Sequence, residues 1–405
     1  MEPIFAQIRP EESGELTAFL NEVFSGAPDS GHFEENLPRM CRSERRICGH
    51  YVLRDGEGGR ILAAVAVFPY DVTIGERTLR FATVGNIAVA EDYRGRGYMR
   101  RLMSEAMRML RETDTDASRL GGLRSRYERY GYEPCGVLHR FTVTPRNLAD
   151  LRHGLDGADG ADSGAFSFEP MRRDDGEAIA LADALYRKNG IWLHRAESGS
   201  FYDSLRMWKS VPRTVRDGAG RIRGYLSTDA GGGSVHEYGW DGPDNERFAM
   251  LCAYAAMRGA DTVFSVYPWD AGLGAAFSRI SEGYQIGIPS NFKILRWDRV
   301  LPALMELKIR TEAHPLPCGE LCFGIPDFGV LRLRVNELGC SAVREPGDSA
   351  GDCVRIDPLA LSRLCFGPYP AAFSELSEAI SDGRARDLIG AWFPLPLSWN
   401  KCDNL

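Results

Sequence analysis

One stretch, residues 84–111, constrains the fold of this 405-residue chain more than any other. It begins with a β-branched run over residues 84–89, which predicts a buried strand. A turn rich in glycine and arginine follows at residues 93–97. From Tyr98 the apolar residues recur every three or four positions, which predicts an amphipathic helix. A strand, a glycine turn and a helix N-terminus together predict an anion site, because free backbone N–H groups and the positive end of the helix dipole converge there.

The spacing within the turn shows which of the known phosphate-binding motifs the turn can match. A Walker loop, G-x-x-x-x-G-K-[ST], requires a Lys that is missing here, and the dinucleotide motif G-x-G-x-x-G fails after Gly97. Residues 94–99 instead resemble the acetyl-CoA signature of the GCN5-related N-acetyltransferases, [RQ]-x-x-G-x-[GA], with Met99 at the position of the usual small residue. The plainer alternative is a strand–helix connection with ordinary turn glycines.

A local excess of arginine accompanies the turn. Six arginines stand between positions 94 and 111 against one acid, Glu105, which suits a polyanionic cofactor. We select Arg94, Arg96 and Arg101 for contact with its phosphates.

A second segment with a motif lies at residues 124–134. It resembles the Y-x-x-x-G-[FY] sequence that follows the cofactor helix in the same superfamily, and the resemblance places Tyr127 at the position of a general acid. The chemistry is reasonable, because the thiolate that leaves coenzyme A needs a proton and a nearby phenol can supply it. The alternative is that Tyr127, Tyr130 and Tyr132 are all packing aromatics.

Composition excludes several classes of function. The net charge of −7 argues against general nucleic-acid binding. The chain has no run of eighteen apolar residues and no signal-peptide pattern at its start, so we expect no membrane span and a cytoplasmic location. The ten cysteines are scattered, and the nearest pair, Cys318 and Cys322, has no partner pair nearby. We therefore expect no metal site and reduced, buried thiols.

The order of predicted elements indicates an α/β (α+β) fold of three parts. Residues 1–150 read as a catalytic acetyltransferase lobe, and residues 151–296 as a second, degenerate lobe of the same type, both with mixed sheets. The second lobe has no basic turn between strand and helix. Residues 297–405 form the third part, whose apolar, aromatic tail from Trp392 we expect to dock against the rest of the protein.

Periodicity predicts the individual elements. In the first lobe they are helices at 10–24, 32–41 and 98–111, and strands at 4–8, 51–54, 61–70, 72–74, 78–82, 84–89, 120–123 and 137–143. A flexible linker at 154–164 follows. In the second lobe they are helices at 174–188 and 245–259, and strands at 221–229, 234–240 and 262–266. In the third part they are helices at 300–307, 358–365 and 371–381, and strands at 319–325, 330–336 and 340–344.

Taken together, this layout resembles the enhanced intracellular survival family, which joins two acetyltransferase lobes to a sterol-carrier-protein-like domain and tolerates a large apolar residue where Met99 stands. The resemblance implies acetyl-CoA as co-substrate, with Tyr127 as general acid and the carboxylate of Leu405 as general base. It also implies a hexamer. The cofactor-binding residues that it implies, with the arginines selected above, are Ile87, Ala88, Val89, Arg94, Gly95, Arg96, Gly97, Tyr98, Met99 and Arg101.

The resemblance implies an N-acetyltransferase acting on a small-molecule or peptide amine of the aminoglycoside, polyamine or lysine type. Acidic residues near Glu22, Asp29 and Glu34 are either solvated helix faces or a wall that attracts such a cation. The alternative function is a non-catalytic scaffold that binds acyl-CoA or lipid. A nucleotide-dependent enzyme has no supporting motif.

Overall fold

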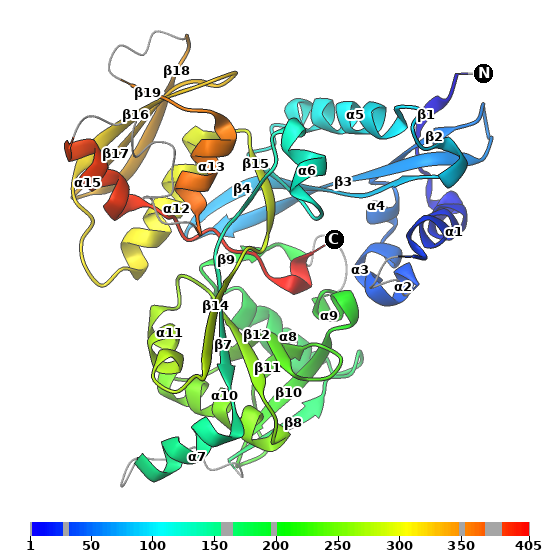
Figure 1. Cartoon of the computed structure of the whole chain (residues 1–405). Helices are drawn as coiled ribbons and strands as arrows, with labels where there is room; N and C mark the ends of the chain where they lie inside the picture. Colours follow the sequence, from blue (N-terminus) through cyan, green and yellow to red (C-terminus); the bar gives the residue numbers. More distant parts are fainter. Residues whose placement is uncertain are drawn as a thin grey trace.

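The computed structural model describes residues 2–26, 32–154, 165–195, 201–347, 353–368 and 383–404. Their strands form three sheets, each with its own helices, which we call the first, second and third lobes (Figure 1). The expected α/β fold with mixed sheets is confirmed. Residues 155–164 of the predicted linker at 154–164, and the predicted helix at 371–381, lie outside the described residues.

The first sheet contains eight strands from the described part of the chain, in the order β1-β2-β3-β4-β5-β15-β6 with β9 paired to β3. Helix α5 covers one face, and helices α1 to α4 cover the other (Figure 1). The strands are β1 (Ile4–Gln7), β2 (His50–Arg54), β3 (Ile61–Ile74), β4 (Arg77–Val89), β5 (Ala117–Leu120), β6 (Glu133–Cys135), β9 (Ile191–Leu193) and β15 (Ser290–Ile294). The helices are α1 (Ser13–Phe24), α2 (Phe33–Asn36), α3 (Pro38–Cys41), α4 (Glu44–Ile47), α5 (Tyr98–Glu112) and α6 (Arg124–Tyr127).

The second sheet has the order β14-β7-β13-β12-β11-β10-β8. Its strands are β7 (Leu138–Val143), β8 (Phe166–Pro170), β10 (Val211–Asp217), β11 (Ile222–Thr228), β12 (Ser234–Trp240), β13 (Thr262–Val266) and β14 (Gly283–Gly287). The helices of this lobe are α7 (Pro145–Gly154), α8 (Gly176–Tyr186), α9 (Phe201–Leu205), the short 3-10 helix η5 (Met207–Lys209), α10 (Asp244–Arg258) and α11 (Ala271–Ser278).

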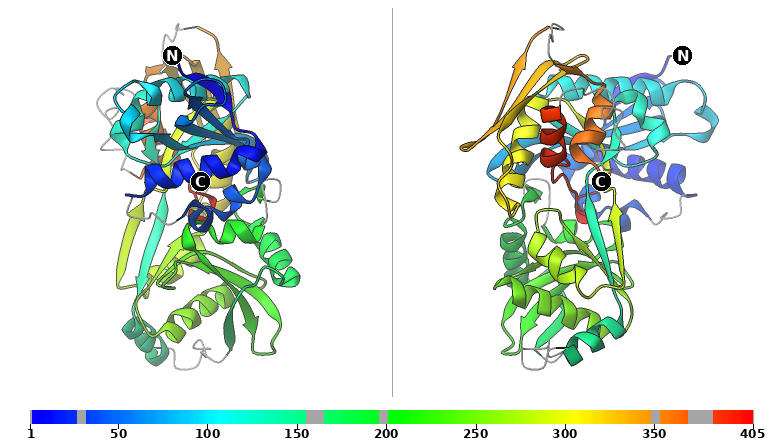
Figure 2. Two further views of the ribbon diagram at one scale, coloured as in Figure 1. Left: turned by 90° about the vertical axis from the view of Figure 1, so that its right-hand side faces the viewer. Right: turned by 60° about the vertical axis from the view of Figure 1, so that its left-hand side comes forward.

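The third sheet, β18-β17-β16-β19, packs against α12, α13 and α15. Its strands are β16 (Gly319–Ile325), β17 (Gly329–Asn336), β18 (Gly339–Glu345) and β19 (Val354–Arg355), and its helices are α12 (Trp297–Thr311), α13 (Pro358–Phe366) and α15 (Gly383–Trp392). In the two central strands, β16 and β17, buried residues alternate with more exposed ones over most of the length, which is the period of a sheet with one covered face. Figure 2 shows this lobe beside the first lobe and the second lobe below both.

The first two lobes exchange a strand. Strand β7 pairs with β13 of the second sheet, with Val143 opposite Thr262. Strand β15 crosses the other way and lies between β5 and β6, where Asn291 pairs with Leu120. The prediction that residues 137–143 close the first sheet is therefore wrong, because a strand's partner is decided by long-range pairing and not by its own periodicity. The lobe boundaries at 150 and 296 stay predictions.

Four predicted short strands are in fact one long hairpin. Strands β3 and β4 run antiparallel from Ile74, opposite Arg77, to Ala64, opposite Ala88. Gly75 forms the turn with a φ of 59°, a conformation that favours glycine. The strand predicted at residues 120–123 lies instead at Ala117–Leu120.

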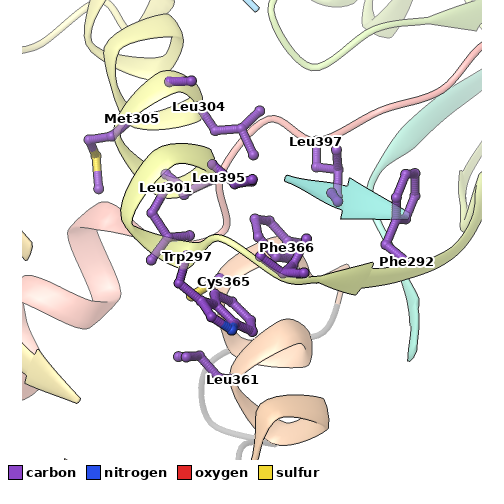
Figure 3. Close-up of a cluster of buried hydrophobic side chains, with 14 of the residues drawn as sticks. Phe292, Trp297, Leu301, Leu304, Met305, Leu361, Cys365, Phe366, Leu395 and Leu397 are labelled. Carbon is purple, nitrogen blue, oxygen red and sulfur yellow. The ribbon is translucent and has the colours of Figure 1, made fainter. Parts of the chain in front are cut away.

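The tail of the chain is docked, as predicted. Leu395 and Leu397 are buried in the cluster that joins the third lobe to the first sheet, next to Trp297 of α12 and Phe366 of α13 (Figure 3). The tail then continues away from the third lobe and ends between the first and second lobes (Figure 1). Residues of β16 and β17 that point toward the helices are buried in the same cluster. Helices α12, α13 and α15 and the tail therefore fill this inner face of the third sheet.

Two further predictions concern cysteines and membranes. Cys322 and Cys353 form a disulfide, with 4.6 Å between their Cα atoms, so the expectation of reduced thiols is wrong for this pair. Within the described ranges, no helix combines the length and the apolar character needed to cross a bilayer. Among the same residues, no group of three or more His, Cys, Asp or Glu side chains is placed to hold a metal ion.

Candidate active site

The site begins where two parallel strands part. Strands β4 and β5 pair from Phe81, opposite Ala117, to Val84, opposite Leu120. Strand β5 then ends, whereas β4 continues to Val89. The last five residues of β4 therefore extend beyond the end of their neighbour, with backbone groups on that edge that a ligand can contact.

A bulge in β4 marks the same place. Asn86 has a φ of 48°, and the pairing with β3 shifts register between Ala64 and Ala66. The amide Nδ2 of Asn86 donates to Nε2 of His50, at 3.0 Å. The Nδ1 of His50 lies 3.0 Å from the carbonyl of Ile47, which can only accept, so Nδ1 carries the proton and Nε2 is the acceptor. Burial lowers the pKa of His50 to about 4, so the ring is neutral at pH 7.

The glycine turn follows β4 and leads into α5. Gly95 and Gly97 have φ values of 79° and 81°, which a residue with a Cβ adopts only with strain. Gly97 is the N-cap of α5 and has no side chain with which to cap the first N–H groups of the helix. The positive end of a 15-residue helix is thus presented at the turn.

These features surround one cavity of about 930 Å³. The predicted residues that line it are Ile87, Val89, Arg94, Gly95, Arg96, Gly97, Tyr98, Met99 and Tyr127. Two predicted residues are not among the lining residues. Ala88 is buried on the opposite face, against α1, which leaves only its main chain as a candidate contact. The guanidinium of Arg101 lies 3.6 Å from the carboxylate of Glu2.

Sequence reasoning missed six residues of the lining. They are Val23, Phe24, Tyr93, Arg100, Arg126 and Arg129. The local excess of arginine between positions 94 and 111 was the available signal for Arg100, but it could not distinguish Arg100 from the neighbouring arginines. The two residues of α1 reach the site only through the tertiary fold.

The arginines of the cavity rim are partly exposed and weakly held. Arg94 pairs with Glu91 at 3.6 Å, and its side chain is 57% exposed. The guanidinium of Arg96 lies over the ring of Tyr93, 4.7 Å from its centroid. Such side chains can turn toward a phosphate at a small cost in free energy, because exposed ion pairs contribute little to stability.

Tyr127 is the buried phenol of the cavity. Its residue is 5% exposed. Burial raises the pKa of Tyr127, and the hydrogen bond with the guanidinium of Arg126 opposes part of that rise. The phenol therefore holds its proton at pH 7, as a general acid must. Tyr130 and Tyr132 are not lining residues, and Tyr132 is buried with its hydroxyl 2.7 Å from Ser118 Oγ.

A second cavity, of about 390 Å³, lies beside the first at the end of the chain. Its lining includes Gly122, Trp208 and Asn404. A Cβ built on Gly122 would stand 2.8 Å from Cε2 of Tyr127, so the tyrosine ring lies directly against this glycine. The two cavities therefore adjoin at Gly122 and Tyr127.

The last described residue, Asn404, is held on both sides. Arg119 Nη1 donates to Asn404 Oδ1 at 2.7 Å, and Trp208 Nε1 donates to the Asn404 carbonyl at 3.0 Å. Leu405 and Asp29 lie outside the described residues. Glu22 and Glu34 do not line either cavity.

Comparison with known proteins agrees with this geometry. Residues 5–135 match the family model described as an acetyltransferase (GNAT) domain, and this segment contains β4, the glycine turn and Tyr127. A search of curated proteins gave no match.

Several solved structures share the fold over nearly the full length. A GCN5-related N-acetyltransferase from Kribbella flavida has a TM-score of 0.64 at 16% identity, over 97% of this chain and 96% of that one. A conserved protein from Enterococcus faecalis V583, described as a probable N-acyltransferase, has a TM-score of 0.62 at 14% identity, over 98% of each chain. Eis1 from Mycobacterium abscessus has a TM-score of 0.60 at 13% identity, also over 98% of each chain.

At these identities the structural likeness establishes the fold, while the family model identifies the domain. Residues 5–135 form an acetyltransferase domain of the GNAT type, and the chain is an acyltransferase.

Proposed function

We propose that this protein is an acetyl-CoA-dependent N-acetyltransferase of the enhanced intracellular survival type that acts on a cationic amine by direct attack. The observation that carries the proposal is the cavity of about 930 Å³ that the glycine turn, the end of β4 and Tyr127 line together. A cofactor site and a proton donor that share one cavity favour an enzyme over a non-catalytic scaffold for acyl-CoA or lipid.

The residues present fit acetyl-CoA. The main-chain amides of residues 94–99, at the N-terminus of α5, would hold its pyrophosphate. The main chain of residues 87–89 in β4 would accompany the pantetheine arm, because that edge extends past β5. Arg94 and Arg96 line the cavity and would neutralise phosphate charge, and Arg101 would need to leave Glu2 to do the same.

In the reaction, the amine nitrogen forms a bond to the acetyl carbon and the carbon–sulfur bond then breaks. Tyr127 gives its proton to the departing thiolate, and the carboxylate of Leu405 accepts the proton that the amine loses. A backbone N–H near Val89 would stabilise the oxyanion between these two events. The held position of Asn404, one residue before the terminus, supports the assignment of the base.

The cationic acceptor is proposed from the family resemblance, as are the hexamer and the cytoplasmic location. The third lobe is proposed, from the same resemblance, to be of the sterol-carrier type. We also propose that its role is structural, because its own helices and the tail fill the face of the sheet that they cover.

The test is acetyl-CoA consumption, followed by thiol release, with a panel of polyamines, aminoglycosides and lysine peptides. We expect release that depends on both acetyl-CoA and an amine, with at least one class of the panel turned over. Binding of acetyl-CoA without consumption by any amine would contradict the proposal and favour the scaffold.

A further inference from the structure

Four charged side chains meet, buried, where the lobes adjoin the end of the chain. Arg39 belongs to α3, Arg195 follows β9, Glu237 belongs to β12, and Asp403 lies in the 3-10 helix η7 (Lys401–Asp403) of the tail. All four are at most 3% exposed. Figure 1 shows the tail ending between the first and second lobes. We call these four residues the tail cluster.

Asp403 is the best-held residue of the tail. Its Oδ1 accepts from Arg195 Nε at 2.9 Å, and its Oδ2 accepts from Arg195 Nη2 at 3.1 Å. The hydroxyl of Tyr186 also donates to Oδ2, at 2.9 Å. The other edge of the same guanidinium binds Glu237, at 2.9 and 2.6 Å, so Arg195 bridges the tail to the second sheet.

The formal charges of the tail cluster balance. Arg39 Nη1 lies 3.8 Å from Asp403, which gives two cations and two carboxylates. Burying four charges is expensive, and apolar residues of similar size would often stabilise a fold as well. Breaking such a cluster by removing one partner is costly, however, because it leaves a buried charge without its counterion.

The residues on either side of Asp403 are fixed as well. Asn400 Nδ2 donates to Glu237 at 2.5 Å and to the Tyr267 hydroxyl at 2.6 Å. On the other side, Trp208 donates to the Asn404 carbonyl from a strained backbone, since its φ is 57°. Strained residues persist where the surroundings require them, often at functional sites. The polar contacts of the tail thus continue to the last described residue.

We propose that Asp403 is a positioning residue for the transferase reaction: bound to Arg195, it fixes Asn404, the last described residue, in the cavity beside Gly122 and Tyr127. The effect on catalysis rests on the proposed function, in which the terminal carboxylate is the base. The fixing of the tail does not.

The experiment uses three full-length variants. Asp403→Asn removes the tail's charge from the cluster. The double variant Arg39→Met with Asp403→Asn removes one charge of each sign, so the cluster stays neutral. It serves as the test if the single variant folds poorly. The control is Asp270→Asn, which removes a carboxylate that accepts from Arg247 at 2.8 Å within the second lobe. Asp270 makes no hydrogen bond or ion pair with the described residues of the tail. Cooperative unfolding in urea establishes that each variant is folded.

Two readouts are taken. The first is removal of C-terminal residues by a carboxypeptidase, followed by mass spectrometry, which reports how often the tail detaches. The second is kcat together with KM for acetyl-CoA. We expect Asp403→Asn and the double variant to be trimmed at least about tenfold faster than the wild type and the control. We expect their kcat to fall by about tenfold or more at nearly unchanged KM for acetyl-CoA, because the glycine turn is untouched.

Equal trimming rates for the wild type and both Asp403 variants would overturn the positioning role, whatever happens to kcat. Fast trimming with a wild-type kcat would show that the tail is held by Asp403 and would instead contradict Leu405 as the base. The two proposals therefore fail in different ways.

Discussion

At the scale of single residues, Gly122 decides where the phenol of Tyr127 can lie. Its φ is +125°, and the position of a Cβ is already occupied by the tyrosine ring. We predict that Gly122→Ala lowers kcat by about tenfold while KM for acetyl-CoA changes little, because the substitution displaces only Tyr127, the proposed proton donor. Gly121→Ala is the matched control, since a Cβ there meets no atom within 4 Å. Equal kcat values for the two variants would show that the ring is not constrained by this contact.

The buried imidazole of His50 should make the free energy of unfolding depend on pH. Burial lowers its pKa to about 4, whereas an unfolded histidine titrates near 6.5. Between these values the unfolded chain binds a proton that the folded chain does not, so the free energy of unfolding decreases as pH falls from about 6.5 to about 4. The contribution of His50 is at most about 3 kcal/mol. Burial also lowers the pKa of His236 to about 4, which adds a change of the same sign.

The measurement is urea unfolding at about pH 7.5 and about pH 5. We predict that His50→Gln reduces the difference between the two conditions without abolishing it, since His236 remains. The exposed His314→Gln should leave the difference unchanged. A His50 variant with the full wild-type difference would mean that the imidazole is not held neutral beside Asn86.

At the scale of elements, the turn before α5 is the feature to which we assign acetyl-CoA binding. Gly97 caps the helix with a left-handed backbone, and a side chain there costs about 1–2 kcal/mol. We predict that Gly97→Ala raises KM for acetyl-CoA by about tenfold and affects kcat much less. Gly14→Ala, within α1 and with open space around it, should leave both constants unchanged. An unaltered KM in Gly97→Ala would contradict the assignment of this turn to the cofactor.

Elements with a strong local pattern could be predicted from the sequence. Helix α5 begins at Tyr98 as expected, and strands β13 and β16 have the predicted bounds. Pairing could not be predicted. Strand β7 follows the first lobe in sequence but joins the second sheet. Its partners lie more than a hundred residues away, so no local pattern reveals them.

The residues of the candidate site also fall into two groups, those that a local sequence pattern reveals and those that only the tertiary fold brings to the site. The glycines and Tyr127 carry a spacing that a single sequence can reveal, and the structure brings them to one cavity. Phe24 and Arg126 belong to that cavity too, but nothing in their local sequence distinguishes them. The contacts of Asn404 depend on residues from β5 and η5 and have no local signal at all.

At the scale of the whole molecule, the lobes are not independent. Strand β15 fills the place between β5 and β6, so residues 1–150 alone lack an interior strand of their own sheet. We predict that a fragment of residues 1–150 shows no cooperative unfolding in urea, whereas the full chain does. A fragment that unfolds cooperatively would show that the exchange is dispensable for the first lobe.

The fold places Asn404 in a cavity next to Tyr127, which lines the proposed cofactor cavity, and the central claim is that the phenol of Tyr127 donates the proton. The most direct measurement is the steady-state kinetics of Tyr127→Phe with acetyl-CoA and the best amine of the panel. The account predicts a kcat about a hundredfold below that of the wild type at a nearly unchanged KM for acetyl-CoA. A wild-type kcat in Tyr127→Phe would contradict it.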